Sequence, residues 1–163
     1  MEPCRSLALL TGSLGLVSMV VALSTNFWIV AMGPSMSAHT GLWPSEGSVA
    51  VYIRVTQSFS ILATLCILVS VVILALSFFP LLSAPGRSPL FAAITALTAA
   101  LFMIVAMAVY TSERWVQVPG SQIQVFFGWS FYVGWVSVLL LLCTGALTMD
   151  AYCGARRPGY EAV

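Results

Sequence analysis

The segment VTQSFSILATLCILVSVVILALSFF, residues 55–79, decides the fold because it runs for 25 residues without a charged side chain. A helix rises about 1.5 Å per residue, so a segment of this length can cross a hydrocarbon core of about 30 Å. Lipid offers no hydrogen bonds to backbone N–H and C=O groups, so an apolar run that crosses it must be helical. The segment therefore predicts a transmembrane helix.

Three further apolar runs lie between the charged residues, at 6–27, 90–111 and 126–149. None of the four runs contains Asp, Glu, Lys, Arg or His. Of the whole chain, 60% is apolar and 7% is charged, whereas a soluble domain has about 45–50% and about 25%. The sequence therefore predicts an all-α membrane protein with four transmembrane helices embedded in the lipid bilayer.

The loops follow from these bounds. One four-span domain covers residues 1–163, with a long external loop at 28–54, a short external loop at 112–125 and a cytoplasmic tail at 150–163. The formal net charge of +1 gives no basic field, so we expect no nucleic-acid partner.

The orientation follows from counting arginines, because cytoplasmic loops carry an excess of them. With both termini in the cytoplasm, four arginines are cytoplasmic and two are external. The cytoplasmic set is Arg5, Arg87, Arg156 and Arg157, and the external set is Arg54 and Arg114. The first run could instead be a cleaved signal peptide, but its length of about 22 residues exceeds the about 7–15 of such segments, which favours a retained helix.

Small residues recur along the first run and favour close helix packing, since small side chains let two backbones approach within lipid. This packing could lie within the bundle, which we favour, or between two copies in a homo-oligomer. The positions near one face of the helix are Ala8, Gly12, Gly15, Ser18 and Ala22.

Residues that carry chemistry are scarce. Membrane-embedded ionisable groups usually mark proton relays and substrate sites, and His39 is the only histidine. We therefore predict no enzyme activity, no catalytic or metal-binding residues and no cofactor. Cys4 and Cys153 lie beside the predicted first and fourth helices, where they could carry S-palmitoyl groups or stay unmodified thiols.

An ordered set of residues resembles the superfamily of peripheral myelin protein 22, epithelial membrane proteins and claudins. The set comprises Trp28, then Gly41, Leu42 and Trp43, and Arg54 before the second helix. The resemblance implies a left-handed four-helix bundle with a small antiparallel sheet from residues around 27–32 and 39–43. It also implies that the tryptophans and the Gly-Leu-Trp element anchor this sheet at the membrane surface, and that Arg54 caps the bundle beneath it.

The chain departs from that pattern after Trp43. Members of the family place two cysteines there, whereas residues 44–48 read PSEGS and no external loop contains a cysteine. A claudin-like adhesion or barrier role at cell contacts, which relies on a disulfide-pinned sheet, is therefore the second hypothesis.

The last residues of the sequence predict sorting of the protein by a clathrin adaptor. Gly159, Tyr160 and Val163 form a Tyr-x-x-apolar signal preceded by glycine, of the kind bound by clathrin-adaptor medium chains. A PDZ domain could instead bind the terminal carboxylate, with Glu161 two places earlier. Within the family, the runs at 4–10, 110–115 and 157–161 are similar to a granule membrane protein of cytotoxic lymphocytes. This similarity implies residence in a lysosome-related granule, other granule membrane proteins as partners, and a part in exocytosis and target-cell killing.

Overall fold

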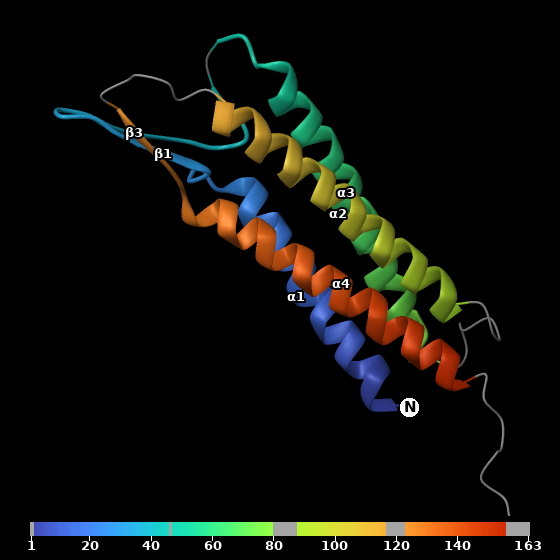
Figure 1. The fold of residues 1–163 in the computed structure, drawn as a ribbon. Helices are drawn as coiled ribbons and strands as arrows, with labels where there is room; N and C mark the ends of the chain where they lie inside the picture. The colour runs from blue at the N-terminus through green and yellow to red at the C-terminus, as the bar shows by residue number, and fades with distance from the viewer. Residues whose placement is uncertain (1, 46, 80–87, 117–122, 156–163) are drawn as a thin grey trace, which may run out of the picture.

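The computed structural model describes residues 2–45, 47–79, 88–116 and 123–155 of the chain. Within them, four long helices run side by side (Figure 1). Each is long and apolar enough to cross a membrane, which confirms the predicted fold class. The helices are α1 (Glu2–Ser24), α2 (Val51–Leu76), α3 (Ser88–Val116) and α4 (Trp129–Ala155). The prolines and glycine between α2 and α3, and the tail from residue 156, lie outside the described residues.

The helices pack as a four-membered ring in which α1 lies along α4 and α2 lies along α3. A third seam joins α3 to α4, and the seam between α1 and α2 is the sparsest of the four. The beginning of α1 and the end of α4 lie at the same end of the bundle, and a small sheet lies at the other (Figure 1). This arrangement places the described ends of the chain on one side of a membrane.

The sheet has three antiparallel strands, β1 (Ile29–Met32), β2 (Ser37–Thr40) and β3 (Gln124–Phe127), in the order β2-β1-β3. The hairpin of β1 and β2 agrees with the pair of strands implied by the family resemblance, but β1 begins two residues later than expected and β2 lies at 37–40 rather than 39–43. The third strand was not predicted, and residues 126–127 were wrongly assigned to the fourth helix. Phe127 pairs with Ile29 instead. The assignment was wrong because periodicity alone cannot distinguish a strand from a helix in a short apolar run.

The helix bounds also differ from the apolar runs. α1 starts four residues earlier than predicted and ends three residues earlier, and α2 begins at Val51 rather than at residue 55. α3 and α4 continue past their predicted ends at 111 and 149. The helices therefore include charged residues close to their ends, among them Arg5, Arg54, Arg114 and Asp150. The length of an apolar run reflects the thickness of the lipid core. A helix can continue beyond that core into the headgroup region, where long charged side chains reach water.

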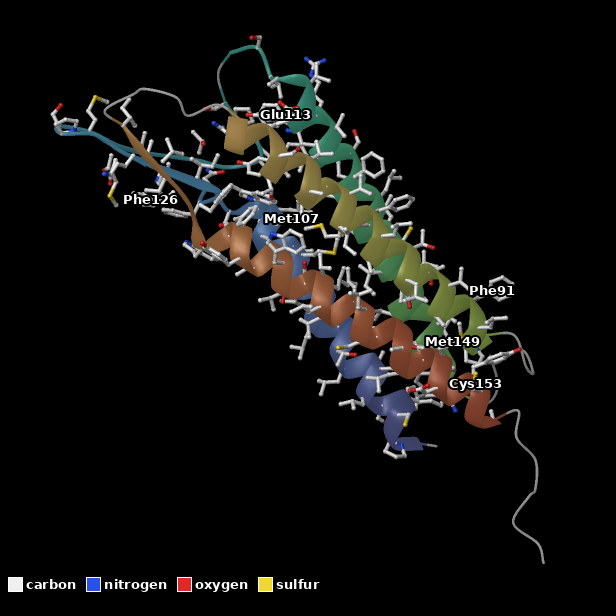
Figure 2. All side chains as sticks on the ribbon, viewed as in Figure 1. Phe91, Met107, Glu113, Phe126, Met149 and Cys153 are labelled. Atoms are coloured by element: carbon white, nitrogen blue, oxygen red, sulfur yellow. The ribbon has the colours of Figure 1, made fainter. Side chains whose placement is uncertain are left out.

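The bundle interior is built from small and hydroxyl-bearing side chains. α2 buries six residues separated alternately by four and three positions, Thr56, Ser60, Ala63, Ile67, Ser70 and Leu74, which is the spacing of helices packed side by side. On α3 the side chains of Ala92, Ala96 and Ala100 are fully buried. Met107, labelled in Figure 2, fills part of the interior toward the sheet end.

The small-residue stripe of α1 faces α4. A Cβ added at Gly12 would lie 3.1 Å from Thr144 Cγ2, and one at Gly15 would lie 3.3 Å from Leu140 Cβ. The hydroxyls of Thr11 and Thr144 also hydrogen-bond across this seam, at 3.0 Å. The stripe is therefore used inside the bundle, as favoured above, and leaves the outward face of α1 to lipid.

Candidate functional site

Trp28 lies beneath the sheet, where α1 ends and β1 begins. Its side chain is fully buried, and its indole Nε1–H donates to the Ala22 carbonyl at 2.6 Å. The last carbonyls of a helix have no partner within that helix, so this bond satisfies one of them. The family resemblance implied an anchor at the membrane surface, and the structure places Trp28 inside the protein at the end of the bundle.

The Gly41-Leu42-Trp43 element returns to the same helix end. Trp43 Nε1–H donates to the Leu23 carbonyl at 2.9 Å, next to the carbonyl bound by Trp28, although the Trp43 side chain is 47% exposed. Leu42 is fully buried. Its carbonyl accepts from Gln57 Nε2 of α2 at 2.7 Å. Two tryptophans far apart in the motif therefore cap consecutive carbonyls of one helix.

Gly41 is the residue that allows this return. A Cβ at position 41 would lie 2.6 Å from Asn26 Oδ1 and 2.8 Å from Asn26 Cα. The second of these atoms belongs to the backbone, so it cannot move aside cheaply. The glycine of the motif is thus explained by the close approach of the 41–43 segment to the turn after α1.

Arg54 does not cap the bundle as the resemblance implied. Because α2 begins at Val51, Arg54 lies in its first turn, and its side chain is exposed. The cation that reaches inward is Arg114, in the last turn of α3, whose guanidinium carbon lies 5.9 Å from the centre of the Tyr52 ring. A motif gives the order of residues along the chain, but it does not say which side chain turns inward.

An aromatic cluster beneath the sheet was missed by sequence reasoning. Tyr110 of α3 and Phe131 of α4 lie 5.0 and 6.4 Å from Trp28, measured between ring centres. Phe127 of β3 stacks on Phe131 at 4.2 Å. Aromatic pairs at such separations contribute about 0.5–1.5 kcal/mol beyond the area they bury. The runs around residues 110 and 131 contain these aromatics, but only the returning chain brings them to Trp28.

Gly128 was also missed. It joins β3 to α4, its N–H donates to the Trp28 carbonyl at 2.9 Å, and a Cβ there would overlap the carbonyl of Phe27. The glycine between a short apolar strand and a long apolar helix was the one signal for a break at this point.

The outward surface of the sheet is uncharged and partly apolar. The three strands contain no Asp, Glu, Lys or Arg, and Met32, Met36 and Phe126 are all more than half exposed. Figure 1 shows the β1–β2 hairpin projecting beyond the end of α1 and the beginning of α4. Edge strands usually carry charges that prevent pairing with other chains. This surface is therefore suited to contact with another molecule rather than to chemistry.

The other predicted sites lie at the opposite end or beyond the described residues. Cys4 is half-buried in the first turn of α1, and Cys153 is exposed in the last turn of α4, as Figure 2 shows for Cys153. Gly159, Tyr160 and Val163 lie outside the described residues. Among the described residues no group of three His, Cys, Asp or Glu side chains could hold a metal ion.

Comparison with known proteins supplies the context for this geometry. The sequence model of the PMP-22/EMP/MP20/Claudin family matches residues 6–148. The chain is 61% identical to Protein NKG7 of Homo sapiens and 61% identical to Protein NKG7 of Mus musculus, in both cases over the full length of both chains. It is 32% identical to the lens fiber membrane intrinsic protein of Homo sapiens over 85% of each chain.

Proposed function

The chain belongs to the PMP-22/EMP/MP20/Claudin family, and we propose that it is a non-enzymatic membrane protein of cytotoxic granules. In this proposal it supports the trafficking and exocytosis of those granules, and hence target-cell killing, in natural killer cells and T cells. The observation that carries the proposal is the similarity to NKG7, which extends over the full length of both chains. The chain is a multi-pass membrane protein with four spans, so a role within a granule membrane is physically open to it.

The tail provides the route to the granule. An adaptor medium chain binds a Tyr-x-x-apolar peptide as an added strand, with pockets for the tyrosine and the apolar residue. Tyr160 and Val163 supply those two groups, and Gly159 precedes them. Binding requires a cytoplasmic tail, which the arginine count favours. After exocytosis the same orientation leaves the tail in the cytoplasm at the plasma membrane.

The mode of action is lateral binding of other granule membrane proteins. Two features support it. The middle of each described helix lacks the ionisable groups that mark ion or proton paths. The sheet exposes an uncharged apolar surface, and exposed apolar patches of a protein usually serve as contact sites.

The location of the protein in a cytotoxic lymphocyte tests this proposal. We would image the wild type, Tyr160→Ala and Glu161→Ala, each with an internal epitope tag that leaves Val163 at the terminus. We expect the wild type and Glu161→Ala in lytic granules and Tyr160→Ala at the cell surface, because position 161 is not bound in an adaptor pocket. Release of granule contents on target contact is then expected to fall in cells that lack the protein and to recover with Glu161→Ala.

The same experiment separates the alternatives. If Glu161→Ala leaves the granules and Tyr160→Ala remains, capture by a PDZ domain replaces adaptor sorting. If all three proteins gather at cell contacts, a claudin-like adhesion role replaces the granule role. The exposed sheet is the observation that keeps adhesion as the second candidate.

A further inference from the structure

A groove of about 420 Å³ lies at the end of the bundle opposite the sheet. Four residues of α1 line it, Ser6, Leu9, Leu10 and Ser13, together with Phe78, which follows α2. Their spacing of three, one and three places them on one face of the helix. The groove lies where α1 meets the end of α2, along the sparsest seam of the bundle. The groove is open along its outer side, so a ligand in it would keep one face toward the surrounding lipid.

Arg5 carries a positive charge and lies beside this groove, against Phe78. Its Nη2 donates to the carbonyl of Ser77 at 2.6 Å and to Ser77 Oγ at 2.7 Å. The guanidinium carbon lies 5.2 Å from the centre of the Phe78 ring. These contacts hold Arg5 beside a groove-lining residue while they cap the end of α2. A guanidinium has five N–H donors, so several remain for another partner, and Arg5 forms no ion pair with any described residue.

Among the described residues, the hydroxyls of Ser6 and Ser13 belong to a minority on the helices that also includes Ser18 of α1 and Ser60 of α2. Most others donate to a carbonyl one turn earlier, as Thr95 and Thr98 do. Within the described part of the chain, neither Ser6 nor Ser13 has a hydrogen-bond partner. Among the described residues, the groove thus combines an apolar wall with hydroxyls that have no partner, and it lies beside an arginine without an ion pair.

We propose that this groove binds one phospholipid with a negatively charged headgroup. The phosphate lies near Arg5, whose positive charge favours an anion. An acyl chain lies against Leu9, Leu10 and Phe78. The choice of leaflet rests on the orientation proposed above, because anionic phosphatidylserine and phosphatidylinositol are concentrated in the cytoplasmic leaflet.

Native mass spectrometry of the purified full chain tests this proposal without reference to its cellular location. The protein is released from a mild detergent after incubation with equal amounts of phosphatidylserine and phosphatidylcholine that have identical acyl chains. We expect one retained lipid for each protein monomer, with phosphatidylserine preferred about fivefold. That factor corresponds to the about 1 kcal/mol that a basic residue contributes near an anionic membrane surface.

Four variants separate charge from shape. Arg5→Gln keeps an amide donor for Ser77 but removes the charge, so the two lipids should bind equally, whereas Arg5→Lys should keep the preference. Leu10→Trp fills the groove and should reduce retention of both lipids. Leu14→Trp is the matched control, because Leu14 is similarly exposed on α1 (50% against 56% for Leu10) but does not line the groove.

Four results would overturn the proposal. Equal retention of the two lipids by the wild type would show that Arg5 does not select an anionic headgroup. Equal retention by the two tryptophan variants would indicate general annular lipid. Dimers that disappear only in Leu10→Trp, with lipid retention unchanged, would show that a second copy occupies the groove. Displacement of the lipid by soluble glycerophosphoserine would show that the headgroup binds without the groove.

Discussion

Replacing Trp28 by phenylalanine tests whether indole N–H groups attach the sheet to the end of α1, and Trp43→Phe is the matched control. The two side chains donate to consecutive carbonyls, those of Ala22 and Leu23, at 2.6 and 2.9 Å. They differ in burial, because Trp28 is fully buried whereas Trp43 is 47% exposed. The pair therefore isolates the effect of burial on the same interaction.

The expected losses of stability follow from what replaces each hydrogen bond. At Trp28 the change leaves the buried Ala22 carbonyl with only the long hydrogen bond from Thr25 Oγ1 at 3.4 Å, which costs about 1–3 kcal/mol, and the smaller ring leaves a cavity. We expect a total of about 3 kcal/mol. At Trp43 water can bond the carbonyl, so we expect about 0.5 kcal/mol. At about 2–4 °C per kcal/mol for a chain of this size, the midpoints should fall by about 6–12 °C and about 1–2 °C.

The assay is heating of the detergent-solubilised protein, followed by measurement of the monodisperse fraction by size-exclusion chromatography. A shift at Trp28 no larger than that at Trp43 would refute the reasoning, because it would mean that burial does not set the cost of the missing bond. Reversal of the two shifts would point instead to Trp43 as the main attachment of the sheet.

Two further predictions concern the close approach of two backbone segments and a hydrogen bond between two helices. Gly41→Ala should destabilise the protein by about 1–3 kcal/mol, because the new Cβ would overlap the backbone of Asn26. Gly33→Ala, whose Cβ would meet nothing nearer than 3.5 Å, should stay within about 0.5 kcal/mol in the same heating assay. A double-mutant cycle of Thr11→Val and Thr144→Val should give a coupling energy of about 0.6 kcal/mol. The coupling is small because each hydroxyl also has a carbonyl of its own helix within reach. If the effects of the two single substitutions simply add, the interhelical hydrogen bond is contradicted.

The four spans could be predicted from the sequence because charged residues are rare enough to delimit them. The element bounds could not, since a helix does not end where the lipid ends. Arg54 marked the start of the second span by its charge, yet it lies inside α2. Phe126 and Phe127 are as apolar as the helix that follows, and only pairing with β1 makes them a strand.

The candidate site was predictable as a set of residues and not as a geometry. The motif gave Trp28 and Trp43, but their function as caps depends on where α1 ends. That end is fixed locally, because Thr25 Oγ1 donates to the Val21 carbonyl at 2.8 Å and the chain then turns into β1. Tyr110 is 82 positions from Trp28 along the chain, a separation that no local pattern spans.

The external loops of this chain contain no cysteine, and hydrogen bonds attach the sheet to the bundle. Trp43 joins the 41–43 segment to α1, Gln57 joins it to α2, and Gly128, just before α4, donates to the carbonyl of Trp28, just before β1. These bonds join the sheet to three helix ends directly. Because none of the four cysteines forms a disulfide, the attachment does not depend on the redox state of the compartment that the sheet faces.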